Sequence, residues 1–206
     1  MKYILIVSIV LVLIFAPLFT ILLLNQCVFS HLFDILHLQQ YNGFEKREYL
    51  NKVSSIIRYF FDRSVYLTIG GFTEIEKIHM KDVKILFLIS FLLFLLSLFF
   101  IVYFRKNLKR DVLKISAVTT IIFVISLIGF SLTNFDEAFT LFHRILFRNN
   151  YWLLDPDTLL IRLFPEEVFM KLAYVWFGGI LLLSLAILLY LYVSRRKHYG
   201  YEYFRN

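Results

Sequence analysis

Four long apolar runs dominate the pattern of the chain. Residues 3–24, 85–104, 115–132 and 172–193 each lack a charged side chain. A run of about 20 apolar residues crosses the hydrocarbon core of a bilayer as one helix. The pattern therefore predicts an all-α integral membrane protein with four transmembrane helices, which we interpret as a single membrane domain over residues 1–206.

Two of the runs have features of their own. The first follows Lys2 and could be read as a cleaved signal peptide, but its apolar core is too long for one, so we expect a retained helix. The only cysteine, Cys27, is then interpreted as an ordinary interfacial thiol. The third run is rich in small and hydroxyl-bearing residues, which let membrane helices approach closely, and we expect it to pack centrally.

The segment after the first run contains helical patterns. Apolar residues recur three or four positions apart over residues 32–38 and 49–61. The second stretch is amphipathic and suited to lie on the bilayer surface or under the other long segment. Thr73 followed by Glu76 is a capping-box pattern, which predicts a helix that runs through His79 into the second membrane span.

The segment after the third run is predicted to contain two short helices. Residues 135–147 and 158–164 have helical patterns, and residues 148–152 between them are expected to be irregular. The turn-forming sequence DPD at residues 155–157 precedes the second helix, and Pro165 precedes the fourth span.

Basic residues predict the orientation of the spans. The short connection 105–114 carries five Lys and Arg, and the tail 194–206 opens with three more. Such clusters mark the cytoplasmic side, so both termini are expected inside. The two long, partly helical segments, 25–84 and 133–171, then lie on the extracytoplasmic side of a bacterial cytoplasmic membrane, where we expect the function to reside.

Composition excludes several classes of protein. With 60% hydrophobic residues and a mean hydropathy of +0.73, the chain is not a soluble enzyme. Its net charge of +7 is distributed in clusters beside apolar runs, which indicates membrane topology and not nucleic-acid binding. The spans lack the central ionisable residue of most transporters, and the common serine-hydrolase, zinc-protease and P-loop motifs are absent.

Histidines are the remaining candidates for chemistry. His79 and His143 fall on the two different outer segments, each near a membrane boundary. A neutral imidazole is the usual general base or acid near neutral pH, although spacing alone favours the interpretation of each residue as a structural hydrogen-bonding partner. His198 is interpreted as part of the basic cytoplasmic tail.

A second group of residues permits a metal interpretation. His31, Asp34 and His37 share one face if residues 31–37 are helical, which would allow a metal pair. Two imidazoles and one carboxylate are a weak pattern, however, and we predict neither a metal nor another cofactor for the protein.

Two sequence stretches around the histidines resemble the lipoprotein intramolecular transacylase family. They are EKIHMKDVK at residues 76–84, and FHRILFRNNYWLLDP at residues 142–156 with LFPE at 163–166. The resemblance covers the whole chain in layout and is most specific around the two histidines. It implies a bacterial membrane enzyme with four transmembrane helices. Its substrate would be a diacylated lipoprotein, whose acyl chains lie in the membrane lipid.

The resemblance also implies a reaction and a site. The enzyme moves the sn-2 acyl chain of a diacylglyceryl cysteine to the α-amino group of the same cysteine, which gives a lyso-form lipoprotein. His79 and His143 match the catalytic residues. The residues that we expect to help form the site are Asn149, Trp152, Asp155, Asp82 and Arg144. The sequence departs from the family pattern at Asn150, so that residue receives no role.

Two other functions remain open at this point. The chain could be a non-enzymatic membrane adaptor with structural histidines, or a metal-dependent lipid hydrolase that uses His79, His143 and Asp155 or Asp157 as ligands. An adaptor would tolerate loss of either histidine, and a metal enzyme would fail with a chelator. The transacylase would need the histidines and ignore the chelator.

Overall fold

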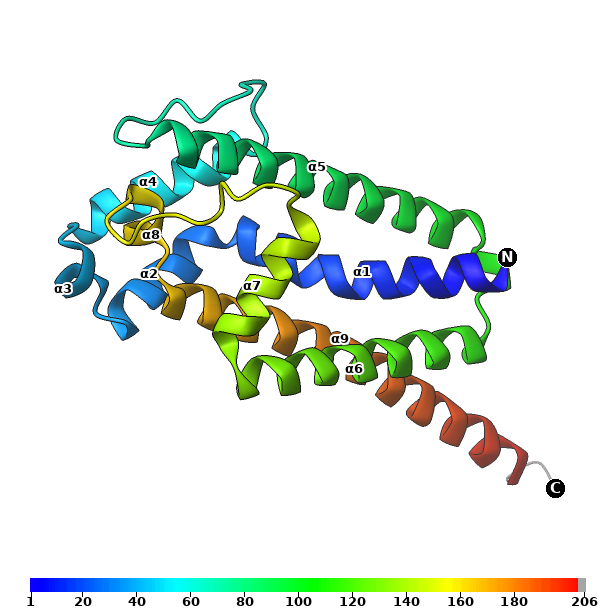
Figure 1. Ribbon diagram of the computed structural model, residues 1–206. Helices are drawn as coiled ribbons and strands as arrows, with labels where there is room; N and C mark the ends of the chain where they lie inside the picture. The colour runs from blue at the N-terminus through cyan, green and yellow to red at the C-terminus, as the bar shows by residue number, and fades with distance from the viewer. Residues whose placement is uncertain (204–206) are drawn as a thin grey trace. The chain divides into compact units, whose positions relative to one another are not determined.

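A computed structural model describes residues 1–203, with side chains to residue 195; the predicted basic patch at His198 lies outside the described side chains. The described chain is helical and contains no strand (Figure 1). The all-α prediction is confirmed. The helices are α1 (Lys2–Leu23), α2 (Asn25–Ile35), α3 (Leu38–Asn42), α4 (Lys46–Tyr59), α5 (Glu74–Tyr103), the 3-10 turn η1 (Arg105–Asn107), α6 (Arg110–Thr133), α7 (Phe135–Leu146), α8 (Leu159–Leu163) and α9 (Glu166–Tyr203).

Four of these helices, α1, α5, α6 and α9, are long and apolar enough to cross a membrane. They contain the four predicted spans. Two of them begin well before their apolar runs, because α5 starts at Glu74 and α9 at Glu166. In each case the polar residues that precede the apolar run lie on the same continuous helix.

The chain forms two compact units, which the four long helices pass through. One unit comprises Met1–Leu18, Leu92–Gly129 and the chain from Trp176 onward. The other comprises Phe19–Phe91 and Phe130–Val175, and it contains α2, α3, α4, α7 and α8. The interpretation of the chain as one membrane domain stays a prediction.

The first unit is centred on α1. Leu5, Ile9 and Leu13 form a buried cluster with Val112 of α6. In α1, 33% of an 18-residue apolar stretch is buried, and the corresponding share in α6 is 22%. The third run is thus less buried than α1 but more buried than α5 (11%) and α9 (17%), and the expectation that it packs centrally stays a prediction. Its small residues allow a close contact with α1: the hydroxyl of buried Ser116 donates to Val112 O of its own helix at 2.8 Å, and its Oγ also lies 3.4 Å from Ile6 O of α1.

A proline and a glycine mark the close approach of α1 and α9. Pro17 removes one backbone hydrogen bond from α1. The indole NH of Trp176 in α9 donates to the nearby Ile14 O at 2.7 Å. A Cβ atom placed on Gly179 would come within 2.8 Å of Pro17 Cβ. Only glycine fits this contact without a shift of one helix.

Replacing Gly179 with alanine is expected to destabilise the protein by about 1–3 kcal/mol, since overpacking forces neighbouring helices apart. The matched control is Gly178→Ala, whose new methyl group meets no atom within 4 Å. It should be neutral or slightly stabilising. Thermal midpoints of the two variants in the same detergent measure the difference, and equal midpoints would contradict the assigned contact.

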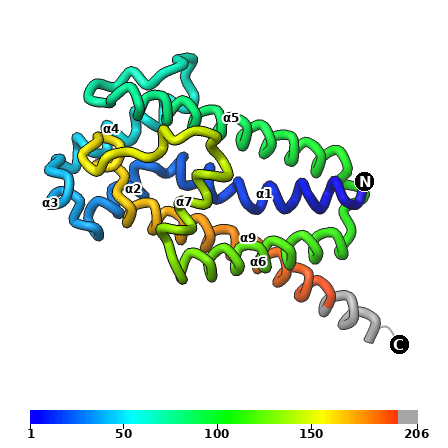
Figure 2. The backbone as a smooth tube through the Cα atoms, in the orientation of Figure 1, coloured from blue at the N-terminus to red at the C-terminus, as the bar shows by residue number. Residues whose placement is uncertain are grey.

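The second unit is held together by aromatic and polar contacts among its short helices. The apolar face of α4, with Tyr49, Val53 and Ile56, is buried. The prediction of an amphipathic helix is confirmed, and its apolar face packs within the protein, against α2 among other elements. Figure 2 follows the backbone from α2 through α3 to α4.

A helix break separates the residues of the suggested metal pair. Helix α2 ends at Ile35, and His37 adopts the left-handed conformation with φ +49° before α3 begins. His31, Asp34 and His37 therefore do not share one helix face, and Asp34 instead pairs with Lys46 at 2.6 Å. In the part of the chain that the structure describes, no group of three or more His, Cys, Asp or Glu is arranged to hold a metal ion.

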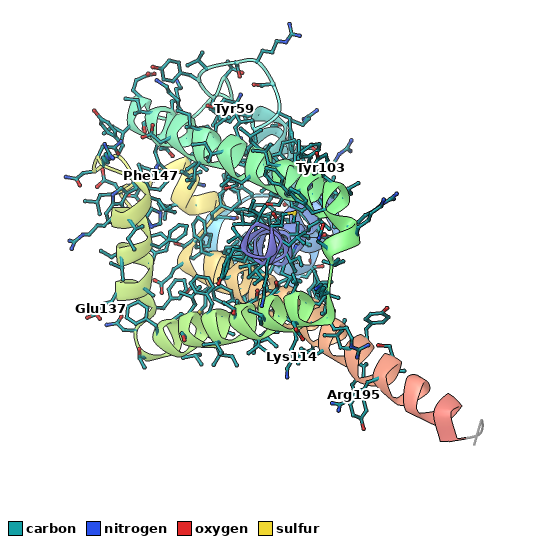
Figure 3. The ribbon with its side chains drawn as sticks, turned by 90° about the vertical axis from the view of Figure 1, so that its right-hand side faces the viewer. Tyr59, Tyr103, Lys114, Glu137, Phe147 and Arg195 are labelled. Carbon is teal, nitrogen blue, oxygen red and sulfur yellow. The ribbon has the colours of Figure 1, made fainter. Side chains whose placement is uncertain are left out.

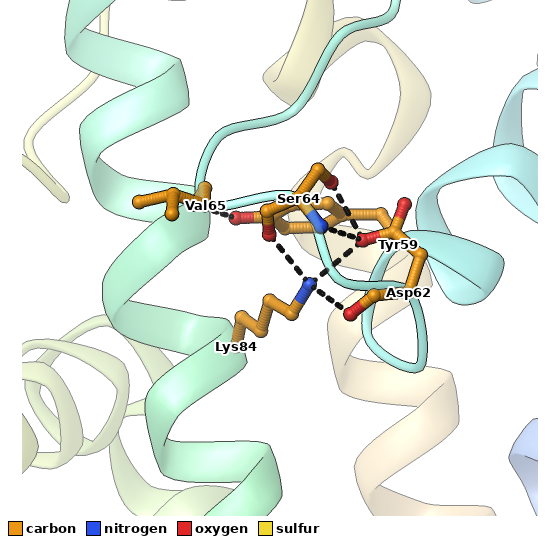
Figure 4. A network of polar contacts seen from close by, with 5 residues as sticks. All are labelled: Tyr59, Asp62, Ser64, Val65 and Lys84. Carbon is orange, nitrogen blue, oxygen red and sulfur yellow. Dashed lines mark hydrogen bonds and ion pairs between the residues drawn. The ribbon is translucent and has the colours of Figure 1, made fainter.

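A buried lysine fixes the loop that leads into α5 (Figure 4). Lys84 Nζ donates to Asp62 O, Asp62 Oδ1 and Ser64 O at 2.8–2.9 Å. It also lies 4.2 Å from the centre of the Tyr59 ring. These bonds lower the pKa of the Asp62 carboxyl. Lys84 is the last charged residue before the second apolar run. Its ammonium group is thus fully hydrogen-bonded by the loop, and these bonds hold the loop against α5.

Candidate active site

His79 lies on the second turn of α5, and its position follows from the capping box. Thr73 N donates to Glu76 Oε2 at 2.6 Å, and Glu76 N donates to Thr73 Oγ1 at 3.3 Å. The predicted helix start is confirmed. The His79 side chain is 7% exposed, and its ring centre lies 5.2 Å from that of Phe147. Its Nδ1 atom is buried without a hydrogen-bond partner in the described structure.

His143 lies on the last turn of α7, which is a well-capped helix. Asn134 Oδ1 accepts from Glu137 N at 3.2 Å. Acidic residues occupy the first turn, where their negative charge interacts favourably with the helix dipole. His143 is buried, and its Nδ1 lies 2.8 Å from Phe139 O. A carbonyl oxygen can only accept, so Nδ1 carries the proton. In the neutral ring, Nε2 is then an unprotonated base.

Aromatic rings hold the His143 imidazole on several sides. The ring stacks on Trp152 with centres 4.9 Å apart and an angle of 27°. Phe139 lies 4.1 Å and Phe147 5.7 Å away by the same measure. Figure 3 labels Phe147 just beyond the end of α7. These contacts restrict the ring and remove it from water.

The imidazole rings of the two histidines lie near one another. Their ring centres are 6.2 Å apart, with an angle of 37° between the planes. This separation is too long for a direct ring-to-ring hydrogen bond. The geometry suits two groups that contact opposite sides of one reacting centre.

Burial sets the charge state of the site. Desolvation lowers the pKa of His143 below its usual value of 6.5, against a smaller opposing effect of the hydrogen bond to Phe139 O. Two positive imidazoles at this distance would also repel each other. At neutral pH, His143 is therefore neutral and able to accept a proton.

A side-chain hydrogen bond joins α5 to the loop after α7. Asn149 Nδ2 donates to Asp82 Oδ2 at 2.8 Å, and Asn149 Oδ1 accepts from Tyr151 N at 3.1 Å. Asp82 follows His79 by three residues and lies on the same side of α5. The Asp82–Asn149 bond therefore connects the segment that carries His79 with the loop that carries Trp152.

The structure does not bring every predicted site residue to the histidines. Arg144 is exposed on α7, where it lines a shallow hollow with acidic residues of the same helix. The Asp155 side chain is exposed, and its backbone carbonyl accepts from Thr158 N and Oγ1 in the turn before α8. The structure thus groups His79 and His143 with Trp152, Asp82 and Asn149.

Glu76 has a second function that sequence reasoning did not find. Its side chain is fully buried, and Oε1 accepts from Leu160 N at 2.7 Å, near the start of α8. One carboxylate thus links the helix start before His79 to the segment after Trp152. The capping box identified Glu76, but its partner 84 residues away carries no sequence signal.

These observations define an all-helical integral membrane protein with a buried pair of histidines contributed by the two long segments 25–84 and 133–171. The sequence profile of the family described as Lipoprotein intramolecular transacylase Lit matches residues 3–169. The chain belongs to this family and is an enzyme of the lipoprotein intramolecular transacylase class. A search of curated proteins finds no match.

Solved structures of the Bacillus cereus transacylase Lit share the fold. One is 25% identical with a TM-score of 0.82, and the similarity covers 95% of this chain and 96% of the other. A second, of a variant with one histidine replaced by arginine, is 24% identical with a TM-score of 0.78, over 97% of this chain and 92% of the other. The four-span integral membrane architecture is thereby confirmed.

Proposed function

We propose that this enzyme moves the sn-2 acyl chain of a diacylglyceryl cysteine to the α-amino group of that cysteine, with His79 and His143 as its catalytic residues. The observation that carries the proposal is the convergence of two buried imidazoles at 6.2 Å, one of them with an unprotonated Nε2. The lipoprotein substrate follows from the family. No candidate nucleophile is required, because amine and ester belong to one molecule.

The two rings take different roles. His143 accepts the proton of the attacking amine at Nε2, since its Nδ1–H is already bonded to Phe139 O. The buried Nδ1 of His79 has no hydrogen-bond partner among the described residues. A proton on Nδ1 would bury an unpaired N–H, which costs more free energy than an unpaired acceptor, so the tautomer with the proton on Nε2 is favoured. The Nε2–H of His79 then donates to the oxyanion at the former ester carbonyl.

The reaction balances without a covalent enzyme intermediate. The amine nitrogen forms a bond to the ester carbonyl carbon, and its proton passes to His143 Nε2. The tetrahedral intermediate collapses, the bond between carbonyl carbon and glyceryl oxygen breaks, and His143 returns the proton to that oxygen. The products are an amide on the cysteine and a free glyceryl hydroxyl group.

The site is proposed to lie on the extracytoplasmic side of the bacterial cytoplasmic membrane, with both termini inside. His79 is near the amino-terminal end of α5, while the basic connection 105–114 follows the carboxy-terminal end. The acyl chains of the substrate remain in the bilayer, and its cysteine reaches the site at headgroup depth.

Tandem mass spectrometry tests the proposed reaction. The enzyme is co-expressed with a diacylated reporter lipoprotein in a host unable to N-acylate it, and the amino-terminal lipopeptide is fragmented. Intact mass is uninformative, because an intramolecular transfer leaves it unchanged. Fragments with one acyl chain on the cysteine nitrogen support the proposal, while an unrearranged diacylglyceryl cysteine from inserted, folded enzyme overturns it.

The pH dependence of the purified enzyme should be set by the substrate amine. An α-amino group has a pKa of about 7.7–8.0 and attacks only when neutral. The pKa of His143 is lowered below 6.5, so its base form is present above that value and is lost only as the pH falls further. We expect kcat/KM to decline as the pH falls through about 8. A decline confined to pH values below 6.5 would contradict this assignment.

A further inference from the structure

Helix α7 has three distinct faces. Phe139 and His143 point inward, where their rings meet those of other elements. Asp136, Glu137 and Arg144 form an exposed polar face. The third face is apolar and uncharged, and it is also exposed.

This apolar face consists of Leu141, Phe142 and Ile145, which are 47%, 50% and 72% exposed. The three side chains lie within about 100° of one another around the helix axis, at 100° per residue. Such a continuous apolar face, with the charged Glu137 and Arg144 on the adjoining side of the helix, is typical of a helix that lies in a membrane interface. Phe130 and Leu132, at the end of α6 and also exposed, continue the apolar surface along the chain.

The contacts of α7 place it at the level where membrane spans begin. Only Asn134 separates α7 from α6, which is one of the four spans. Phe139 contacts Phe169 of α9, and the ring centres are 5.7 Å apart. Phe169 precedes the apolar run that begins at residue 172 by three residues. His143 faces His79 of α5, six residues before the run at 85. At 1.5 Å per residue, these contacts lie about 5–9 Å outside the apolar runs.

We propose that α7 lies in the plane of the membrane, with the face formed by Leu141, Phe142 and Ile145 in contact with bilayer acyl chains. The depth of the contacts matches the boundary between headgroups and acyl chains. Ile145 lies about 160° around the helix from His143, so the lipid contact and the catalytic ring occupy opposite sides. The placement of α7 in the membrane does not require the proposed function. If His143 is the base of the proposed reaction, the placement also has a consequence, because α7 then holds that base at the depth of the substrate ester.

Site-directed spin labelling tests the placement without a measurement of activity. The exposed Cys27 is first replaced in Cys27→Ser, and Leu141→Cys, Ile145→Cys and Arg144→Cys are introduced one at a time. Leu92→Cys in α5, where Leu92 is 57% exposed, serves as the reference for contact with lipid. The labelled proteins are reconstituted in vesicles of phosphatidylcholine and phosphatidylglycerol, and collision rates with oxygen and with a water-soluble nickel chelate are measured.

The measured quantity is the ratio of the collision rate with oxygen to that with the chelate. This ratio should be several-fold higher for the label at position 145 than for the label at position 144, and it should approach the ratio at position 92. Leu141 provides a second apolar position, should a label at 145 prevent folding, as judged by size-exclusion elution. A chelate preference at the apolar positions would overturn the proposal. Low collision rates with both reagents would also overturn it, since another protein surface, such as a second copy, would then cover the face.

Discussion

Replacing His143 with glutamine is expected to abolish N-acylation, whereas replacing His79 with glutamine should leave part of it. General-base catalysis contributes about 10²–10⁴-fold, and an amide cannot supply it. A lost oxyanion donor costs about 10²–10³-fold in rate. Because the amide group of glutamine can donate near the position of Nε2, His79→Gln should recover part of the loss that His79→Ala causes.

Rates of amide formation on a defined diacylated lipopeptide, followed by fragment ions, measure this difference. His143→Asn is the control for structure, because its amide can still donate to Phe139 O as Nδ1 does. It should fold normally and remain inactive. Equal activity of His79→Gln and His143→Gln would remove the basis for assigning different roles to the two rings, and activity in both alanine variants would favour a structural role.

Glu76→Ala should be among the most destabilising substitutions outside the apolar core, at about 3 kcal/mol or more. It leaves Thr73 N and Leu160 N without their acceptors, and each buried donor left unpaired costs about 1–3 kcal/mol. Glu76→Gln should cost less, since one carbonyl oxygen remains. Thermal unfolding followed by size-exclusion fluorescence in detergent measures both.

The matched control for Glu76 is Glu74→Ala in the same helical turn. Glu74 is exposed and pairs with Lys77 at 2.7 Å, so its loss should change stability by less than about 0.5 kcal/mol. Glu76→Ala should also lower activity through the displacement of His79. Similar midpoints for the two alanine variants would show that the link to α8 contributes little.

Local sequence signals predicted the elements of this fold well. Charge-free runs identified four spans, a capping box gave the start of α5, and the pattern of residues 135–147 gave α7. Each of these signals acts through neighbours in sequence. The helix break at His37 escaped prediction, because histidine adopts the left-handed conformation more often than most non-glycine residues but still only occasionally, so its presence does not mark a break.

Long-range contacts were harder to foresee. The meeting of His79 with His143 was expected from resemblance, but the Asp82–Asn149 bond and the Glu76–Leu160 bond depend on how distant segments pack. The greater burial of α1 than of α6 has the same origin. Small residues in α6 indicated a close helix contact, and they could not indicate which helix would be enclosed.

The partner of His143 Nδ1 also bears on the selectivity of the enzyme for aminolysis over hydrolysis. In serine-type triads a carboxylate occupies this position and stabilises the imidazolium, which makes the ring effective against poorly acidic nucleophiles. Here the acceptor is a neutral carbonyl of the same helix. Such a weak base is sufficient for an amine that attacks in its neutral form. In the proposed reaction such a base does little to activate water, and this would protect the ester from hydrolysis while the substrate is bound.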